Sequence, residues 1–153
     1  MSSMELIKKL RESTGSGIVD CKKALSENNN DVEAAVKWLR EKGILKAQKK
    51  QDRETNEGVV SFYNNSSNTK FTVCKIKCET DFVAKNNDFL DFAKTLSKAI
   101  HENQDINDHG TDQDLVSLRI NNKPLTDCLT DLISKIGENI QIVSYKKYSS
   151  KKS

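Results

Sequence analysis

The side chains that could carry out redox, metal or acid–base chemistry are few and widely spaced in this sequence. Its four cysteines include no Cys-x-x-Cys pair, and its two histidines, His101 and His109, fall in an acidic, loop-like stretch. Cys74 and Cys78 lie on the same side of one expected strand, roughly 13 Å apart at the usual rise per residue. That separation excludes both a mutual disulfide and joint metal ligation. We therefore expect reduced, mostly buried thiols and solvated histidines.

The glycine-rich stretch Thr14-Gly15-Ser16-Gly17 is the next candidate, because such loops can cradle a phosphate. It lies between two expected helices and lacks the Gly-Lys-Ser/Thr ending of a phosphate-binding loop, so we interpret it as a turn. With no nucleophile, base or ligand set in place, the sequence predicts a protein that is not an enzyme and that uses no cofactor and no metal.

Two groups of basic residues could contact RNA or an acidic partner. No exposed aromatic residues are interleaved with them, so we favour a solvated helix face and a solubilising tail. The net charge of +3 is also too balanced for a protein that coats nucleic acid. The two groups are Lys46, Lys49, Lys50 and Arg53, and Lys146, Lys147, Lys151 and Lys152.

The stretch Thr80-Asp81-Phe82-Val83 follows directly after a buried strand and allows two interpretations. In the first, Thr80 or Asp81 caps a helix and Phe82 packs down onto the sheet. In the second, Asn86-Asn87-Asp88 restarts the helix and leaves Phe82 on a short turn of its own. A large aromatic beside a carboxylate is a typical anchor of protein interfaces. The sequence leaves both interpretations open.

The elements that position these residues begin with three helices in residues 1–47. Asp31 is expected to cap the third helix, and Gly43 is expected to end it. Apolar residues recur at helical spacing in all three segments. These stripes contain Leu6, Ile7 and Leu10, then Ile18, Val19, Cys21, Ala24 and Leu25, then Val32, Ala35, Val36 and Leu39.

A polar, basic linker over 48–57 leads into a single α+β core subdomain over 58–148, which a polar tail follows at 149–153. We expect a three-stranded antiparallel sheet with helices packed on one face. In its second strand the uncharged residues Thr72, Cys74, Ile76 and Cys78 must face the core. The expected elements are strands 59–63 and 70–79, a helix with the stripe from Phe89 to Ile100, an exposed excursion over 101–114, a helix over 125–136 capped by Gly137, and a strand over 139–148.

Composition agrees with small modules rather than one deep core, because 35% of the residues are hydrophobic and 31% are charged. No run approaches the ~18–20 apolar residues that a membrane span needs. The amino terminus has no secretory pattern. We expect a cytoplasmic protein, or a protein of an organelle matrix after removal of a transit peptide.

Three segments together resemble one known family, translation elongation factor Ts. Residues 10–25 (LRESTGSGIVDCKKAL) resemble its amino-terminal signature, residues 78–86 (CETDFVAKN) its second signature, and residues 135–140 (KIGENI) a third. The three occur in the family's order and span nearly the whole chain. The resemblance therefore rests on several independent motifs.

The resemblance implies a guanine nucleotide exchange factor for the GTPase elongation factor Tu, with an amino-terminal ubiquitin-associated-like (UBA-like) module. Asp81 and Phe82 resemble the pair that inserts into the partner's G domain and disturbs its Mg²⁺ and phosphate site, with Thr80 and Val83 in the same motif. Arg11, Ile18 and Val19 match positions that contact the same G domain. Many relatives carry Met at the last two positions, so here the apolar character is kept without the flexible thioether.

Long members of the family have two core subdomains, whereas residues after 57 have room for one. Short relatives can pair as homodimers, so the resemblance implies a homodimer here, through the sheet or its final strand, with no membrane and no specific nucleic acid as partner. Three alternatives remain: a UBA-like adaptor that binds ubiquitin or a helical partner, a weak RNA-binding protein, and a redox enzyme that uses Cys74 or Cys78.

Overall fold

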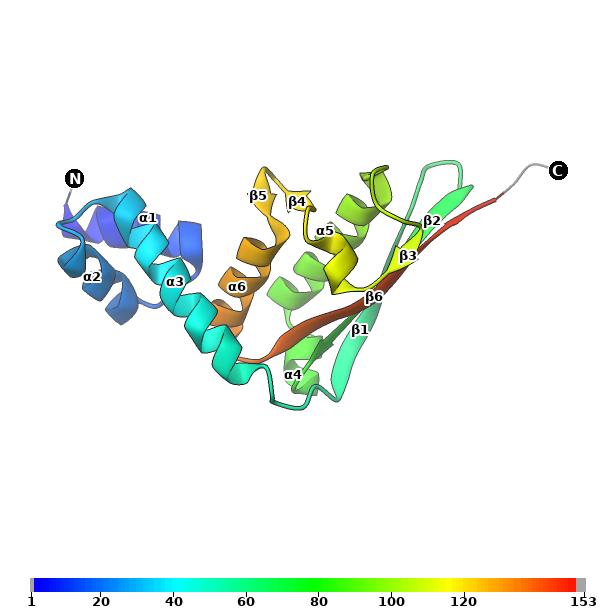
Figure 1. Ribbon diagram of the computed structural model, residues 1–153. Coiled ribbons are helices and arrows are strands. Elements are labelled where there is room, and N and C mark those ends of the chain that lie inside the picture. Colours follow the sequence, from blue (N-terminus) through cyan, green and yellow to red (C-terminus); the bar gives the residue numbers. More distant parts are fainter. Residues whose placement is uncertain (1, 151–153) are drawn as a thin grey trace. The chain divides into compact units, whose positions relative to one another are not determined.

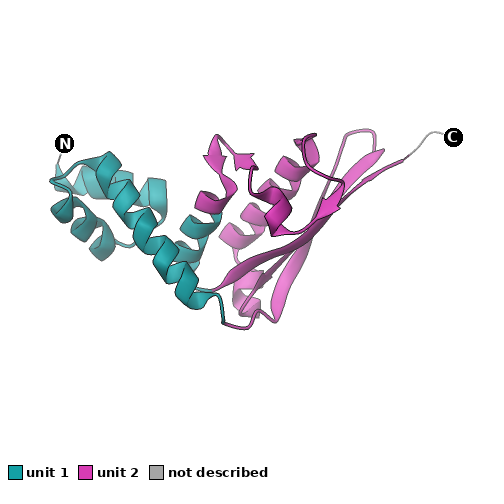
Figure 2. Cartoon of the chain, viewed as in Figure 1, with its two compact units in different colours: residues 1–52, 129–138 teal, residues 53–128, 139–153 magenta. Residues whose placement is uncertain are grey.

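The computed structural model describes residues 2–150, which divide into two compact units (Figures 1 and 2). Of the described residues, unit 1 comprises 2–52 and Leu129–Glu138, and unit 2 comprises Arg53–Cys128 and 139–150. The expected tail residues 151–153, with Lys151 and Lys152, lie outside the described residues.

Unit 1 is built on three helices, α1 (Ser3–Thr14), α2 (Ile18–Glu27) and α3 (Val32–Lys50). Local capping explains their limits. The Ser2 side chain accepts a hydrogen bond from the Glu5 amide at 3.2 Å at the start of α1, and Gly15 ends that helix with a φ of 72°. Asp31 caps α3 by accepting from the Ala34 amide at 3.3 Å, as expected.

The predicted apolar stripes form the core of unit 1, which confirms the helical periodicity. Leu10, Cys21, Ala24 and Ala35 are fully buried. Ile18 and Val19 are exceptions, because they are exposed at the start of α2. The buried core consists of Ile7, Leu10, Cys21, Ala24, Leu25, Ala35 and Leu39.

The expectation that Gly43 ends the third helix is wrong, because α3 continues through it to Lys50. Gly43 is buried, and a Cβ atom there would lie 2.9 Å from the Ser134 hydroxyl oxygen and 3.2 Å from the Thr130 methyl group. Both neighbours are on α6 (Leu125–Ile136), in the part that belongs to unit 1. The glycine therefore permits close helix packing rather than a left-handed cap.

Unit 2 contains a four-stranded antiparallel sheet in the order β1-β2-β6-β3. The long strands are β1 (Glu57–Asn64), β2 (Lys70–Cys78) and β6 (Ile140–Ser149). The pairing of β1 with β2 runs from Glu57 opposite Cys78 to Asn64 opposite Phe71. The inward set Thr72, Cys74, Ile76 and Cys78 is completely buried, which confirms the predicted alternation.

The stretch 101–114 is more ordered than the expected exposed excursion. Its first residues end a helix, and β3 (His109–Gly110) adds a short fourth strand beside β6. A 3₁₀ helix, η1 (Asp112–Leu115), follows, and Leu115 is fully buried. A small hairpin of β4 (Arg119–Ile120) and β5 (Lys123–Pro124) then precedes α6. These elements are too short for a hydrophobic periodicity to be recognised in the sequence.

The remaining helices are α4 (Asp81–Ala84) and α5 (Asn87–Glu102), which lie on one face of the sheet (Figure 1). The stripe predicted for α5 is buried, with Phe89, Leu96 and Ile100 fully enclosed. At the end of α6, Gly137 has a φ of 84° and its amide donates to the Ile133 carbonyl at 2.7 Å, so the predicted C-cap is confirmed.

The chain breaks between α4 and α5 because two side chains cap helices in close succession. Thr80 accepts a hydrogen bond from the Val83 amide at 3.3 Å. Asn86 then accepts from the amides of Asp88 at 2.8 Å and Phe89 at 3.2 Å, which starts α5 anew. Phe82 and Phe89 consequently do not share a continuous helix.

Among residues 2–150, no helix combines the length and the apolar character that crossing a membrane requires.

The two phenylalanines should differ sharply in their effect on stability. Phe89→Ala leaves a cavity under the sheet and should lower the free energy of unfolding by about 3–5 kcal/mol. Phe82→Ala removes an exposed ring and should change it by about 0.5 kcal/mol or less. Urea unfolding followed by circular dichroism measures both, and equal losses would contradict the burial described above.

Candidate partner-binding surfaces

The turn formed by residues 80–83, hereafter the 80–83 turn, projects one large aromatic side chain into solvent. Phe82 is 83% exposed, whereas Val83 is only 9% exposed. Asp81 is exposed beside Phe82, and the Thr80 hydroxyl caps the helical turn that carries both. The interpretation of Phe82 as a residue packed on the sheet is therefore wrong.

The base of this turn is held by contacts that the sequence did not reveal. A carboxylate oxygen of Glu79 accepts from the Asn139 amide at 2.6 Å and lies 3.5 Å from Nη1 of Arg53. The Asn139 side-chain amide donates to the Arg53 carbonyl at 2.9 Å, and Asn139 is only 2% exposed. The Cys78 thiol donates to the Thr80 carbonyl at 3.3 Å. The segment expected to be a free linker thus contributes to this site.

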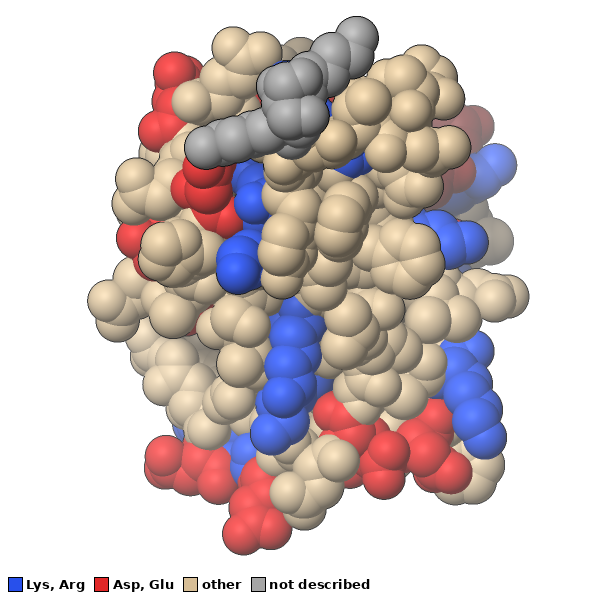
Figure 3. Space-filling view, turned by 90° about the vertical axis from the view of Figure 1, so that its right-hand side faces the viewer, with Lys and Arg blue, Asp and Glu red and all other residues tan. Residues whose placement is uncertain are grey.

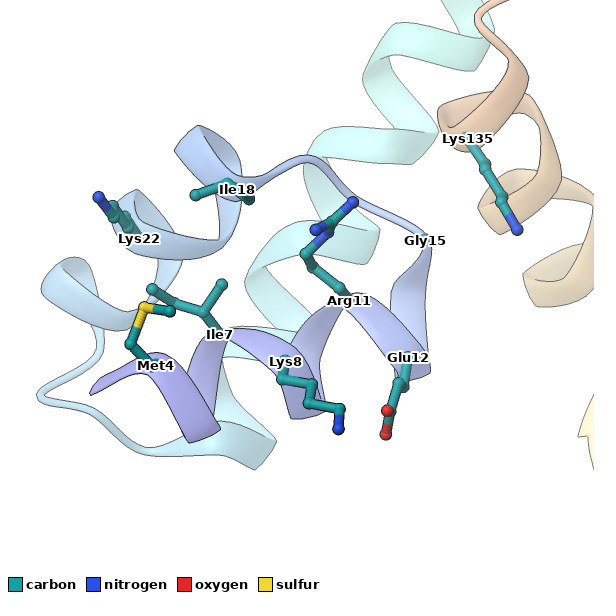
Figure 4. Close-up of a pocket in the computed structure, with 9 residues that line it drawn as sticks. All are labelled: Met4, Ile7, Lys8, Arg11, Glu12, Gly15, Ile18, Lys22 and Lys135. Atoms are coloured by element: carbon teal, nitrogen blue, oxygen red, sulfur yellow. The ribbon is translucent and has the colours of Figure 1, made fainter. Parts of the chain in front are cut away.

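A groove of about 590 Å³ lies on unit 1 and is hereafter the unit 1 groove (Figure 4). Figure 4 shows the Met4 and Ile7 side chains of α1 pointing toward α2, which carries Ile18 and Lys22. The walls of the unit 1 groove combine apolar and basic side chains, which is the chemistry that an apolar peptide segment flanked by acidic groups would complement. The lining residues are Met4, Ile7, Lys8, Arg11, Glu12, Gly15, Ile18, Lys22 and Lys135.

The three residues that the amino-terminal signature singled out fall on or beside this groove. Arg11 and Ile18 line it, and Ile18 is 49% exposed. Val19 follows Ile18 at the start of α2 and is 78% exposed. Burial raises the pKa of the neighbouring Cys21 thiol, and the positive charge of Arg11 partly opposes that shift. Unit 1 therefore presents an exposed apolar pair next to a cation.

The predicted contact residues thus form two groups that belong to different units. Thr80, Asp81, Phe82 and Val83 are in unit 2, and the other three are in unit 1. Within the first group, Asp81 and Phe82 are exposed, whereas Thr80 acts as a cap and Val83 is buried.

The thiols and His101 are held within the fold. Cys74 and Cys78 are fully buried, as expected. His101 is not simply solvated: it lies in α5, its Nδ1 is 3.1 Å from the Thr72 hydroxyl, and its ring meets Tyr63 edge-on. Among the described residues, no cluster of three or more His, Cys, Asp or Glu is placed to hold a metal ion.

The lysines have neighbours that the sequence did not indicate. Lys46 pairs with Asp20 at 3.4 Å, in keeping with a solvated helix face. Lys146, however, lies 4.8 Å from the ring of Tyr148, which stacks on Phe71 with centroids 4.6 Å apart. The expectation that no exposed aromatic accompanies the basic residues is therefore wrong, because Tyr148 lies two residues from Lys146 on the same face of β6 and is 40% exposed.

Two family models match this chain. One, described as "Elongation factor TS", matches residues 79–153. The other, described as "Elongation factor Ts, mitochondrial, N-terminal", matches residues 1–50. The matched regions contain the 80–83 turn and the α1–α2 part of the unit 1 groove, respectively.

Curated proteins named elongation factor Ts are similar over most of the chain. The protein of Campylobacter hominis is 44% identical over 138 residues, which are 90% of this chain and 38% of that protein. The protein of Clostridium perfringens (strain 13) is 41% identical over 150 residues, 97% of this chain and 48% of its own length. That of Aquifex aeolicus is 40% identical over 150 residues, with shares of 95% and 52%. The chain thus spans about half the length of the curated relatives that it matches.

The fold and the two surfaces define an α+β protein with an amino-terminal helical unit and an aromatic turn that projects from the sheet unit. Both family models and the curated relatives are described as elongation factor Ts, and they match the regions that contain these two surfaces. The chain belongs to the elongation factor Ts family.

The reactivity of Cys74 separates this conclusion from a redox enzyme. Burial raises the pKa of its thiol from 9.0 to about 12, so the reactive thiolate is scarce at pH 8. We expect a thiol reagent to label Cys74 slowly in the native protein and quickly in urea, as measured by mass spectrometry. Because the folded pKa is raised, this group favours folding below pH 9 and loses that contribution as the pH rises toward 12. Rapid labelling of native Cys74 would contradict its burial.

Proposed function

We propose that this chain is a guanine nucleotide exchange factor that acts on elongation factor Tu during translation elongation and promotes the release of GDP. The observation that carries the proposal is the 83% exposed ring of Phe82, which lies beside Asp81 on a capped turn. Membership of the elongation factor Ts family supports the identity of the partner.

The two exposed residues of the turn have different roles in this proposal. Phe82 inserts into the partner's G domain and is buried there, while Asp81 disturbs hydrogen bonding around the Mg²⁺ and phosphate site. Thr80 and Val83 support the turn rather than contact the partner, because one caps the helix and the other is buried. Arg11, Ile18 and Val19 supply a second contact from unit 1.

An exchange factor works by linkage and needs no covalent chemistry. A GDP dissociation constant of 1 nM corresponds to about 12 kcal/mol, so GDP leaves slowly unaided. A factor that prefers the nucleotide-free partner weakens GDP binding by the same free energy by which GDP weakens the factor. Each ~1.4 kcal/mol of this coupling changes affinity tenfold.

One phenylalanine can supply a substantial part of the coupling. Burying an exposed phenylalanine contributes about 1.5–3 kcal/mol, which is roughly a tenfold to hundredfold effect on affinity. That gain couples to GDP release only if the pocket for Phe82 is open in the nucleotide-free partner and closed in the GDP-bound partner. The carboxylate of Asp81 adds discrimination at the phosphate site, where negative charge opposes the nucleotide.

Release of fluorescent GDP from elongation factor Tu tests this function. The unmodified chain should accelerate release, and Phe82→Ala should reduce the acceleration by about tenfold or more because the inserted ring is lost. Stopped-flow fluorescence measures both rates.

Val116→Ala serves as the matched control, because Val116 is also an exposed apolar residue of unit 2, at 69% exposure. It should leave the acceleration unchanged. Equal acceleration by the unmodified chain and Phe82→Ala would remove Phe82 from the mechanism, and no acceleration by the unmodified chain would refute the proposed function.

We further propose that two copies of this chain associate through the sheet surface opposite α4 and α5, hereafter the outer face. Its side chains alternate with the buried set: Phe62 lies opposite Val73, and Phe71 opposite Tyr148. The outer face carries the apolar residues Val60, Phe62, Phe71, Val73 and Tyr148, and two lysines lie among them, Lys75 opposite Val60 and Lys146 opposite Val73.

Three observations favour a second copy as the occupant of the outer face. Phe62 and Val60 are 66% and 59% exposed, and paired apolar sheet faces form sandwiches in other proteins. Phe71 and Tyr148 stack on each other, so that together they present a fixed aromatic surface. β6 lies between β2 and β3 in the sheet, which makes the face a better interface than the edge of the final strand. The side of the molecule in Figure 3 shows uncharged side chains in its middle, with Lys and Arg between and beside them.

Sedimentation equilibrium at micromolar concentration tests the association. The unmodified chain should show the mass of two copies, and Phe62→Glu should shift it to one because the large exposed ring that the interface buries is replaced by a charge. A mass of one chain for the unmodified protein would refute the homodimer. RNA binding that weakens steeply with salt would then assign the outer face to RNA.

A further inference from the structure

We propose that Glu79 and Asn139 are positioning residues for Phe82, so that Asn139, which lies in the third signature, helps to fix the direction in which the 80–83 turn projects. This inference rests on the proposed exchange function for one of its tests, and a second test is independent of that function.

The geometry follows from the sheet. β2 and β6 are antiparallel, and their last paired residues at this end are Cys78 and Ile140. Glu79, which follows β2, and Asn139, which precedes β6, therefore face each other just beyond the sheet. The carboxylate of Glu79 accepts from the backbone N–H of Asn139 at 2.6 Å, so a side chain continues the hydrogen bonding of the two strands by one residue.

A third segment joins the same corner. The Asn139 side-chain amide donates to the Arg53 carbonyl at 2.9 Å, and the Arg53 guanidinium lies 3.5 Å from the Glu79 carboxylate. Two residues on, Thr55 is buried and its hydroxyl lies 3.5 Å from the Gln141 side-chain oxygen. Asn139, at 2% exposure, thus ties the start of β6 to the chain that enters β1 and to the residue preceding Thr80.

The turn needs such support because it is too short to hold itself. α4 contains four residues, and an isolated helical turn is unstable in water. Its far end is fixed by the Asn86 cap of α5, and its near end is fixed by Thr80, which follows Glu79 directly. Loosening the near end lets Phe82 sample several directions. Apparent affinity for the partner then falls in proportion to the fraction of molecules with the correct direction.

The first test is a double-mutant cycle read out by fluorescent GDP release from elongation factor Tu. Glu79→Ala removes the carboxylate that accepts from the Asn139 backbone, and Asn139→Ala removes the buried side-chain bond to the Arg53 carbonyl. Each variant should reduce the acceleration about tenfold. Glu79→Gln keeps an oxygen acceptor and should stay within about twofold. In a Phe82→Ala background, Glu79→Ala should cause little further loss, since there is no ring left to position.

A buried substitution controls for lost stability. Ile76→Val truncates the core under β2 and should leave the acceleration unchanged in both backgrounds. A further tenfold loss from Glu79→Ala in the Phe82→Ala background would overturn the positioning role, because the effect would then not pass through Phe82.

The second test measures amide hydrogen exchange by nuclear magnetic resonance and needs no partner. The Val83 and Ala84 amides bond to the Thr80 hydroxyl and carbonyl, so they report on the turn. They should exchange about tenfold faster in Glu79→Ala and Asn139→Ala, while the Leu10 and Leu39 amides of unit 1 stay unchanged. Unchanged exchange in the turn would overturn the inference. Faster exchange in a chain that does not accelerate GDP release would uphold the positioning role and refute only the exchange function.

Discussion

The close succession of two helix caps is the constraint on which the candidate site depends. Thr80 starts one helical turn and Asn86 starts the next helix, so no continuous helix can carry both Phe82 and Phe89 on one buried face. Phe89 enters the core and Phe82 is left in water. The exposed ring therefore arises from satisfied backbone hydrogen bonds at both ends of α4 rather than from backbone strain. No residue between 80 and 86 has a positive φ.

The sheet gives this turn a fixed base. β2 is completely buried on one face, which fixes the side of the strand that faces the core. Its register against β1 is continuous, whereas its register against β6 shifts at a β-bulge between Lys75 and Ile76, after which Cys78 lies opposite Ile140. The residues that follow β2 and precede β6 are consequently held opposite each other, and Glu79 meets Asn139 at this point. The core packing of unit 2 and the placement of its exposed aromatic are thus consequences of the same strand register.

Long periodic elements could be predicted from the sequence because their side-chain spacing records the face that they bury. This holds for the helical stripes of unit 1, the alternation from Thr72 to Cys78, and the helix after Pro124. Gly43 could not be interpreted correctly, because a glycine required by a neighbouring helix looks the same in sequence as a glycine that ends one. The environment of His101 depends on Thr72 and Tyr63, which are distant in the chain. The role of Asn139 likewise depends on two other segments, and only the fold brings them together.

The size of one side chain limits what the 80–83 turn can accomplish alone. Burying Phe82 offers about 1.5–3 kcal/mol, whereas a nanomolar nucleotide represents about 12 kcal/mol. A factor need not match the whole of that energy, because it must only weaken the nucleotide enough for release and then be displaced in turn. Binding that is too strong would trap the partner without nucleotide, since the coupling acts equally in both directions. In the proposed function, a single well-placed ring with a second contact from the apolar pair Ile18 and Val19 would therefore suit repeated exchange better than one large hydrophobic interface.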